Sequence, residues 1–490
     1  MPHGTSAAIL DALTRHGLLV AVRGPLPATF AGITDDSRVA RDGVLFAAVK
    51  GNARDGHAYL GQVEALGASA ALVSDADATT LPAIIVSDTR RAVAVAAAAY
   101  FGAPADALTL VGVTGTNGKT TSASMLRHLL SREGADAASI GTLGVLVGSE
   151  GRVLPGGGGL TTPGPIELQR VLRELVDAGV RQVAMEASSH ALHQHRLEGL
   201  PFQAALFTNL TRDHLDYHGS MAEYLSAKAL LVGLLADDGC LVVNADDAAW
   251  AALPPTAHRR LTFSTGAHAA DVRASEVVFS PVGSRFTLHA HAGDAVAVVL
   301  PLLGDFQVEN AVGAAAVAVA LGLPLAEVGA RLSSMPQVPG RLERLSTAPA
   351  VLRDYAHTPD ALERALQSVR PFATGRVIVA FGAGGDRDRG KRPEMGRVAA
   401  ALADVCIVTS DNPRTEVPSA IIDDIVAGMP PGRALCEEDR RVAIARAIAM
   451  AGPDDLVLLA GKGHETYQIR GTTSYPFDEA EIVAELTAAR

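Results

Sequence analysis

The sequence predicts an α/β protein of about three domains, the central one built on a mostly parallel sheet. A chain of 490 residues is too long for a single hydrophobic core. Short apolar runs rich in β-favouring residues alternate with helical patterns, which is typical of strands joined by crossover helices. Polar, often glycine-rich clusters follow several of these runs. We therefore expect binding sites at the carboxyl ends of strands.

The composition fits a packed α/β chain and argues against disorder. Hydrophobic residues make up 48% of the chain, charged residues 19% and aromatic residues 4%. The formal net charge of −11 and the pI near 5.8 argue against a protein that binds nucleic acid through its overall charge. A local basic binding site is still possible. Acidic small molecules would need local Arg and Lys side chains.

The cysteines and apolar runs suggest a cytoplasmic protein. Cys240, Cys406 and Cys436 are far apart and lack metal-ligand spacing, so we expect reduced, buried side chains. The N-terminus has no signal-peptide pattern. The most apolar later runs, 92–101 and 311–323, fall short of the roughly 20 residues that span a bilayer, so we expect no membrane segment.

Residues 1–105 are expected to form a small α/β domain. Apolar runs at 43–49, 70–73 and 83–86 alternate with polar turns, and a helix at 91–100 leads to a boundary near 102–104. Ser37, Arg38 and Asn52 could bind a polar ligand. From spacing alone they are more simply turn-forming residues.

A phosphate-binding loop follows the first strand of the central region. The apolar run 108–113 leads into Gly115-Thr-Asn-Gly118-Lys119-Thr-Thr, and a helix is expected at 122–130. Glycines allow backbone N–H groups to surround an anion. A Lys can contact the phosphates, and a hydroxyl can bind a metal ion. Val113 occupies the place of a glycine in the strict P-loop pattern, so this is a shortened loop. The alternative is an ordinary strand–turn–helix with a surface lysine.

The central region, residues 106–335, repeats strand and helix. The expected strands are 108–113, 182–185, 204–207 and 240–243. Polar clusters follow the first three of them, at 114–121, at 186–190, and at 208–209 with 213–214. These positions are where an open α/β sheet binds its ligand.

A magnesium site is chemically reasonable in this region. Mg²⁺ prefers oxygen ligands, which Thr120 and Glu186 would supply, but Glu186 could equally be a local cap. Five histidines, which also raise the possibility of zinc, lack cysteine or repeated carboxylate support: His190, His193, His195, His214 and His218. On pattern alone, Lys228 would be a surface lysine on a helix.

The last third, residues 336–490, is expected to have a polar site of its own. A Pro- and Gly-containing boundary at 335–341 precedes strands at 376–381, 404–409 and 456–460, and each strand ends in a polar cluster. The side chains of Arg387, Asp411, Arg414 and Glu465 are of both signs, which suits a zwitterion. A mutual salt-bridge network would have the same composition. The residues alone indicate an ATP-using α/β enzyme with a second polar site.

Several motifs together resemble the Mur ligase family. They are Gly-Thr-Asn-Gly-Lys-Thr-Thr, Glu-Ala-Ser-Ser-His, Thr-Asn-Leu-Thr-Arg-Asp-His-Leu-Asp-Tyr-His-Gly, Asp-Tyr-Ala-His-Thr-Pro, Asp-Asn-Pro-Arg and Gly-Lys-Gly-His-Glu. The resemblance covers nearly the whole chain. It implies a UDP-binding domain at 1–105, a P-loop-type ATPase domain at 106–335 and a Rossmann-like, amino-acid-binding domain at 336–490.

The resemblance is to the members that add the third residue of the peptidoglycan stem. It implies an ATP-dependent acid–amino-acid ligase that uses Mg²⁺ and takes part in cell-wall synthesis. ATP would phosphorylate the D-glutamate carboxylate of UDP-N-acetylmuramoyl-L-alanyl-D-glutamate, and an amine would attack the acyl phosphate. We expect a monomer with small-molecule partners and no nucleic acid.

The resemblance also implies roles for individual residues. Lys119, Glu186, His214 and Lys228 would be catalytic, and Thr120, Glu186, His214 and a carbamylated Lys228 would bind metal. The expected ATP contacts are Gly115, Thr116, Asn117, Gly118, Lys119, Thr120, Thr121, Asn310, Arg341, Asp354 and His357. The expected contacts of the UDP-linked dipeptide are Ser37, Asn52, Thr161, Thr162, Ser188, Gln194 and Arg196.

The identity of the third amino acid depends on the C-terminal clusters. Its expected contacts are Arg387, Asp411, Asn412, Pro413, Arg414, Gly461 and Glu465. The Arg414 guanidinium would pair with the extra carboxylate of meso-2,6-diaminopimelate. L-lysine or L-ornithine would leave this guanidinium without a carboxylate partner. The rival interpretations are another Mur-type ligase, a folylpolyglutamate synthetase, and a nucleotide-binding regulatory module without ligase chemistry.

Overall fold

The residues that the structure describes form four β-sheets in an α/β fold, as the sequence predicts. The computed structural model describes residues 4–51, 54–157, 159–266, 268–290 and 293–488. The contact pattern within the chain separates two compact units. The first comprises residues 1–273, 289–294 and 310–328, and the second comprises 274–288, 295–309 and 329–490. The finer division into three domains stays a prediction.

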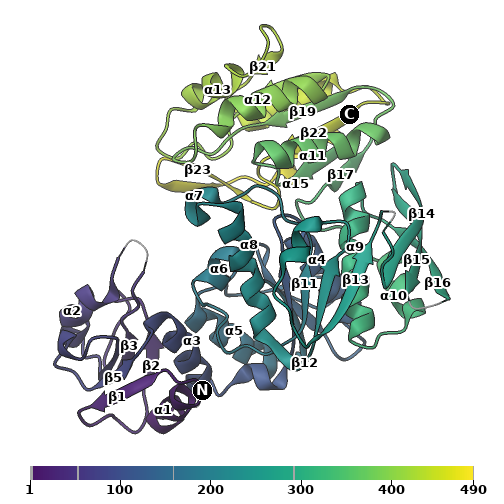
Figure 1. Cartoon of the computed structure of the whole chain (residues 1–490). Helices are drawn as coiled ribbons and strands as arrows, with labels where there is room; N and C mark the ends of the chain where they lie inside the picture. The colour runs from purple at the N-terminus through teal and green to yellow at the C-terminus, as the bar shows by residue number, and fades with distance from the viewer. Residues whose placement is uncertain (1–3, 52–53, 158, 267, 291–292, 489–490) are drawn as a thin grey trace. The chain divides into compact units, whose positions relative to one another are not determined.

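The N-terminal part of the first unit is built on a five-stranded sheet, shown in violet in Figure 1. Its order is β1-β5-β4-β3-β2, with β1 antiparallel to β5 and the other pairs parallel. The strands are β1 Leu19–Arg23, β2 Gly32–Thr34, β3 Val44–Ala47, β4 Ala70–Val73 and β5 Ala83–Val86. The helices are α1 Ser6–Arg15, α2 Leu60–Ala65 and α3 Thr89–Tyr100. Asp88 caps α3 by accepting hydrogen bonds from the N–H groups of Arg90 and Arg91.

The larger sheet of the first unit places the phosphate loop at its centre. The neighbouring strands run in the order β13-β12-β11-β6-β10-β7-β8-β9, and β6 pairs in parallel with both β10 and β11. The strands are β6 Thr109–Thr114, β7 Ala137–Gly141, β8 Gly144–Val147, β9 Arg152–Leu154, β10 Gln182–Glu186, β11 Phe202–Phe207, β12 Leu235–Asn244 and β13 Arg259–Ser264. The strands predicted at 108–113, 182–185, 204–207 and 240–243 are therefore present.

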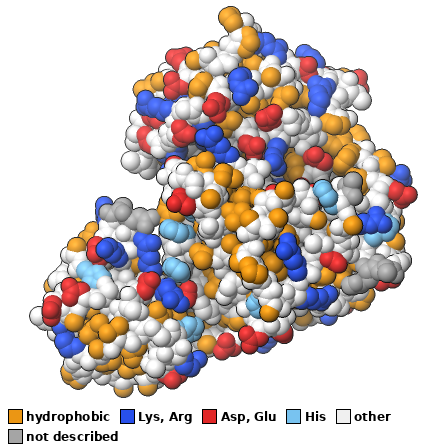
Figure 2. Space-filling model, in the orientation of Figure 1, with side chains coloured by type: hydrophobic (Ala, Val, Ile, Leu, Met, Phe, Trp, Pro, Cys, Tyr) orange, Lys and Arg blue, Asp and Glu red, His pale blue; other side chains and the backbone are white. Residues whose placement is uncertain are grey.

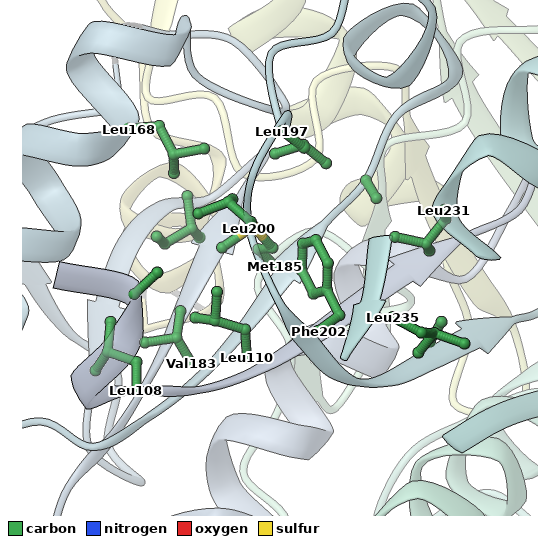
Figure 3. Close-up of a cluster of buried hydrophobic side chains, with 14 of the residues drawn as sticks. Leu108, Leu110, Leu168, Val183, Met185, Leu197, Leu200, Phe202, Leu231 and Leu235 are labelled. Atoms are coloured by element: carbon green, nitrogen blue, oxygen red, sulfur yellow. The ribbon is translucent and has the colours of Figure 1, made fainter. Parts of the chain in front are cut away.

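Helices cover both faces of this sheet. The helices are α4 Lys119–Leu130, α5 Pro165–Asp177, α6 Ser189–His193, α7 Leu215–His218, α8 Met221–Ala229 and α9 Asp305–Ala320. Pro165 occupies the first turn of α5, where its missing N–H costs nothing. The buried positions Leu168, Val171, Leu172 and Leu175 have the spacing of one helical face and belong to one hydrophobic cluster with residues of β6, β10 and β11. Figure 3 shows Leu168 in this cluster together with side chains of these strands. On the opposite face of β11, Leu206 lies beside Gly313 of α9.

The second unit contains a six-stranded sheet in the order β17-β18-β22-β19-β20-β21. Its strands are β17 Glu343–Thr347, β18 Ala350–Asp354, β19 Val377–Phe381, β20 Val405–Val408, β21 Ala434–Cys436 and β22 Leu456–Ala460. Only β17 is antiparallel to its neighbour. The carboxyl ends of β18, β22, β19 and β20 consequently share one edge.

Further helices are α10 Leu325–Ser333, α11 Pro359–Val369, α12 Lys391–Leu402, α13 Pro418–Val426, α14 Arg440–Met450 and α15 Glu479–Ala488, and a separate hairpin pairs β23 Tyr467–Arg470 with β24 Thr473–Pro476. The strands β14 Val272–Ser280, β15 Gly283–Ala290 and β16 Asp294–Leu300 belong to the sheet that contains β6, in the order β16-β15-β14-β13. Cys240 and Cys406 are buried as expected, but Cys436 is exposed, because it ends the edge strand β21. No helix among the described residues is long and apolar enough to cross a membrane.

Candidate functional site

The phosphate loop lies between β6 and α4 and requires its two glycines. Gly115 has a φ of +147°, and a side chain there would collide with the Thr208 hydroxyl. Gly118 has a φ of +85°, and a side chain there would collide with the Asn310 amide. Asn310, which the resemblance placed at the nucleotide, is 4% exposed and lies beside this loop.

The segment after β11 fixes the conformation of the loop. The N–H of Thr116 donates to the Asn209 carbonyl at 2.7 Å, and the N–H of Asn117 donates to Asn209 Oδ1 at 2.9 Å. The Thr208 hydroxyl donates to the Asn117 carbonyl at 2.7 Å. The polar segments 114–121 and 208–209, which follow β6 and β11, are thus joined by hydrogen bonds, as expected at the carboxyl ends of adjacent parallel strands.

Lys119 and Lys228 both lie against this loop. Lys119 Nζ donates to the carbonyls of Gly115 and Thr116 at 3.0 and 2.8 Å, and Lys228 Nζ donates to the Gly115 carbonyl at 2.7 Å. Lys228 is 1% exposed, so the surface position suggested by its pattern is wrong. It lies on the same face of α8 as Tyr224, whose ring is 4.3 Å from its ammonium. Burial, and secondarily the charge of Lys119, lower the pKa of Lys228.

Glu186 ends β10 with a buried, fully oriented carboxylate. It is 2% exposed. The N–H of Thr142 donates to Oε1 at 2.7 Å, and the Thr142 hydroxyl donates to Oε2 at 3.2 Å. Gly141 is required here, since a side chain would collide with Glu186. Thr142 cannot be predicted from the sequence, because a threonine in a short turn gives no signal of the carboxylate that it binds.

A small, partly open pocket lies between α4, the β7–β8 turn and β10. Thr120, Ser124, Ser139 and Glu186 contribute to its lining. The Thr120 hydroxyl and the Glu186 carboxylate are the hard oxygen donors that Mg²⁺ prefers, so these residues fit that ion. Among the described residues, no group of three or more His, Cys, Asp or Glu side chains is arranged to bind a metal.

The residues expected at the dipeptide are linked in one hydrogen-bonded chain. The Thr162 hydroxyl contacts the Glu186 carbonyl at 2.6 Å and the Ser188 hydroxyl at 3.1 Å. Arg196 donates to the Thr162 carbonyl at 2.8 Å and to Gln194 Oε1 at 2.7 Å. Burial lowers the pKa of Arg196. Thr161 joins the group through a 3.4 Å contact between its hydroxyl and that of Thr142.

The histidines form a ring cluster around Tyr217. The rings of His190 and Tyr217 are 4.1 Å apart, and those of His190 and His214 are 4.8 Å apart. His218 is buried and contacts the Ser189 hydroxyl at 3.0 Å. Burial, followed by the charges of His214 and His218, lowers the pKa of His190 to about 4. His193 contacts the Tyr217 hydroxyl at 3.0 Å, whereas His195 contacts Glu198 at 3.2 Å.

The N-terminal candidates are only partly described. Ser37 is half-buried in a turn after β2. Arg38 forms an ion pair with Asp36 at 2.7 Å within the same turn, consistent with a turn-forming role for this segment. Asn52 lies outside the described residues.

In the second unit, three residues expected at the nucleotide, Arg341, Asp354 and His357, lie around the end of β18. Asp354 accepts hydrogen bonds from the N–H groups of Leu342 and Ala356 at 2.8 and 2.9 Å, and burial raises its pKa. The Arg341 guanidinium lies 4.9 Å from the centre of the Tyr355 ring. The carbonyl of His357 accepts a 2.8 Å hydrogen bond from Lys391, and burial lowers the pKa of His357.

The amino-acid candidates gather at the ends of β19, β20 and β22. Gly461 lies against Asp411, and Asn412 donates to Glu465 Oε2 at 2.8 Å. The Arg414 guanidinium donates to the Gly385 carbonyl at 2.8 Å. Gly384 has the side chains of Arg414 and Arg387 as neighbours, and Pro413 lies against Gly385. Lys462, which our sequence analysis left out of the site, is fully buried among these groups.

Comparisons with known proteins identify the family of this chain. The Mur ligase middle domain matches residues 113–318, and the Mur ligase glutamate ligase domain matches residues 340–463. A protein of Gloeobacter violaceus, named UDP-N-acetylmuramoyl-L-alanyl-D-glutamate–2,6-diaminopimelate ligase, is 44% identical over 94% of both chains. A protein of the same name from Geobacter sulfurreducens is 43% identical over 94% of this chain and 95% of its own.

Solved structures also match the whole chain. A structure of a UDP-N-acetylmuramoyl-L-alanyl-D-glutamate–2,6-diaminopimelate ligase covers 96% of this chain and 97% of its own, with a TM-score of 0.69 and 33% identity. MurF from Acinetobacter baumannii, at 22% identity and a TM-score of 0.65, covers 100% of this chain and 99% of its own and shares the fold. The predicted fold class is therefore confirmed. This chain belongs to the Mur ligase family.

Proposed function

We propose that the chain is an ATP-dependent amide ligase that adds meso-2,6-diaminopimelate to UDP-N-acetylmuramoyl-L-alanyl-D-glutamate. The observation that carries this proposal is the cluster of mixed charge at the ends of β19, β20 and β22. There Asn412 donates to Glu465, Arg414 donates to the Gly385 carbonyl and Gly461 lies against Asp411. A dicarboxylic diamino acid needs partners of both signs. The activity named for relatives at 43–44% identity supports the same substrate.

The phosphate loop would bind ATP and support transfer of its terminal phosphoryl group. The Gly115–Thr121 backbone would surround the phosphates, and Lys119 would neutralise developing negative charge. Asn310 would complete this site, and Arg341, Asp354 and His357 would be further nucleotide contacts. The D-glutamate carboxylate would attack the phosphorus and release ADP. The amine would then attack the acyl phosphate and release phosphate.

Thr120 and Glu186 would bind Mg²⁺ at the pocket between them. The metal would supply positive charge that shields the phosphate oxygens. His214 and Lys228 would contribute to a second metal position. An ammonium cannot bind a metal ion, so this role requires Lys228 to be carbamylated, which native mass spectrometry tests directly.

The hydrogen-bonded chain from Thr161 to Arg196 would bind the muramoyl-dipeptide, and Ser37 and Asn52 would contact the UDP group. Arg196 is well suited to a carboxylate because its guanidinium is already oriented by Gln194 and Thr162. Since ATP and the UDP-linked precursor are cytoplasmic metabolites, we place the enzyme in the cytoplasm, acting as a monomer.

The decisive experiment supplies the purified chain with ATP, Mg²⁺ and UDP-muramoyl-dipeptide, plus one amino acid at a time. We expect ADP and a new amide with meso-diaminopimelate, and much slower turnover with L-lysine or L-ornithine. Faster turnover with either of these would overturn the assignment of the third residue. ATP binding without any amide product would favour a regulatory module.

A further inference from the structure

Lys462 is a buried cation at the centre of the amino-acid candidates. It follows β22, between Gly461 and Gly463, and its side chain has no exposed surface. Its ammonium lies 3.2 Å from Asn412 Oδ1, 3.3 Å from Glu465 Oε2 and 3.6 Å from Asp411 Oδ1. A buried ammonium needs such partners because burial removes its hydration.

These contacts fix the orientation of the Asn412 amide. Its Oδ1 atom accepts hydrogen bonds from Lys462 Nζ and, at 2.9 Å, from the N–H of Ile469. Its Nδ2 atom therefore faces Glu465, to which it donates at 2.8 Å. Lys462 thus orients two residues that we expect to contact the amino acid, and it bonds directly to one oxygen of the Glu465 carboxylate.

The backbone of the Asp411–Arg414 loop is held by the β23–β24 hairpin, independently of Lys462. The side chain of Gln468 donates to the Asp411 carbonyl at 2.7 Å. The N–H of Arg414 donates to the Ile469 carbonyl at 3.1 Å, and the N–H of Gly471 donates to the Arg414 carbonyl at 2.7 Å. Removing the Lys462 ammonium should therefore change side-chain orientation and charge while the loop keeps its path.

Lys462 also adds one positive charge to the amino-acid candidates. Without it, the cations Arg387 and Arg414 balance the carboxylates of Asp411 and Glu465. With it, these five residues have an excess of one positive charge. This positive excess favours a diamino acid with two carboxylates, such as diaminopimelate. It disfavours L-lysine, which has two ammonium groups but only one carboxylate.

We propose that Lys462 is a positioning residue that also determines specificity, by orienting Asn412 and Glu465 and by disfavouring diamino acids that lack a second carboxylate. This inference rests on the proposed function. It adds a residue that does not itself contact the substrate but acts through two residues that do.

The test compares Lys462→Met, which keeps the length of the side chain but removes its charge, with the wild-type chain. We expect the KM for meso-diaminopimelate to rise on the order of 10- to 100-fold, because the Glu465 carboxylate loses its cationic partner. The KM for ATP should stay within about threefold. The ratio of kcat/KM for meso-diaminopimelate to that for L-lysine should fall about tenfold or more.

The matched control is Arg353→Met, which removes another buried cation of the same unit. Arg353 is 8% exposed and pairs with Glu343 and Asp478. This variant should lose thermal stability but keep the wild-type preference for the amino acid. A folded Lys462→Met protein with the wild-type preference, or with equal increases in the KM for ATP and for diaminopimelate, would overturn the inference.

If Lys462→Met does not fold, the double variant Lys462→Met/Glu465→Gln removes the opposite charges together and is compared with Glu465→Gln alone. A further shift toward L-lysine in the double variant supports the inference, and an identical preference in the two proteins overturns it. Wild-type protein that forms no amide would instead overturn the proposed function, so the two failures are distinguishable.

Discussion

Arg414 combines an unusual backbone conformation with a partly satisfied guanidinium. Its φ of +52° lies in the left-handed region, which a side chain other than glycine rarely adopts. The β23 strand stabilises this conformation by accepting the Arg414 N–H at the Ile469 carbonyl. One guanidinium nitrogen donates to the Gly385 carbonyl at 2.8 Å. We infer that the strain positions the rest of the guanidinium for a ligand carboxylate.

Replacing Arg414 with Ala should therefore impair use of the amino acid selectively. We expect the KM for meso-diaminopimelate to rise about 100-fold, because a carboxylate would lose its guanidinium partner, while ATP binding changes little. Steady-state kinetics with each substrate varied in turn measures both. Arg441→Ala, which removes an exposed arginine from α14, should leave both values unchanged. Equal loss of ATP and amino-acid binding would contradict this role.

At the residue scale, sequence analysis identified the motif residues but not their supporting partners. The glycines at 115 and 118 were predictable, because the loop chemistry demands them. Lys228 was misplaced on pattern alone, since a helical lysine gives no local signal of burial against a loop far away in sequence. The roles of Thr142 and Lys462 could not be predicted from the sequence for the same reason. Their partners, Glu186 and Asn412, come near only when strands pair.

At the scale of elements, the β7–β8 turn supports the Glu186 carboxylate. The turn is only two residues long, and the N–H and hydroxyl of Thr142 bond the two carboxylate oxygens separately. Partners that orient a metal-binding carboxylate contribute to metal affinity. The turn is therefore part of the proposed magnesium site, although it would not bind the ion itself.

Substituting Thr142 by Val should weaken Mg²⁺ binding about tenfold, because the hydroxyl bond to Glu186 is lost. The concentration of Mg²⁺ that gives half-maximal ADP release measures this effect. Binding of Mn²⁺ to the complex with ADP, followed by electron paramagnetic resonance, gives a readout independent of turnover. Thr142→Ser keeps the hydroxyl and should behave as wild type. An unchanged metal requirement in Thr142→Val would rule out this supporting role.

Buried parallel strands were the most predictable elements, and exposed antiparallel strands were the least predictable. The strand β22 was predicted with its observed bounds, because all five of its residues are buried and apolar. Strand β24, which is exposed along its whole length, and the short strand β9 have no comparable apolar run. The β23–β24 hairpin, which supports Arg414, was consequently missed.

At the scale of the whole molecule, charges of both signs are interspersed over the face shown in Figure 2, although the net charge is −11. Some of these charges join segments that are distant in sequence. In the first unit, Arg91 on α3 pairs with Glu198 at 2.6 Å, and His195 contacts the second oxygen of the same carboxylate. The hydrogen bond from His195, with a further contribution from Arg91, lowers the pKa of Glu198 to about 2 from its ordinary value of 4.5.

This shift predicts a dependence of stability on pH. A carboxylate whose pKa is lowered on folding stabilises the native state above its unfolded pKa, and this stabilisation is lost as the pH falls toward the folded pKa. Glu198→Gln should therefore lower the free energy of unfolding at pH 7 by about 1 kcal/mol, after allowing for solvent screening. The difference from wild type should shrink between pH 4.5 and pH 3.

Urea denaturation of both proteins at several pH values measures this difference. Glu485→Gln provides the control, because Glu485 is 60% exposed and pairs with Arg441, which is 52% exposed. This control should match wild type throughout the pH range. A constant difference between Glu198→Gln and wild type down to pH 3 would mean that the carboxylate charge is not responsible.

The parallel order of β18, β22, β19 and β20 has a consequence for how this enzyme can diversify. Each strand is tied into the core, while the loop that follows it is free to vary in side chains without disturbing the pairing of its neighbours. Because side chains of two of these loops bond one another, as Lys462 and Asn412 do, a lineage that acquires a different amino-acid specificity would have to change those loops together. The strands beneath would meanwhile preserve the ancestral scaffold.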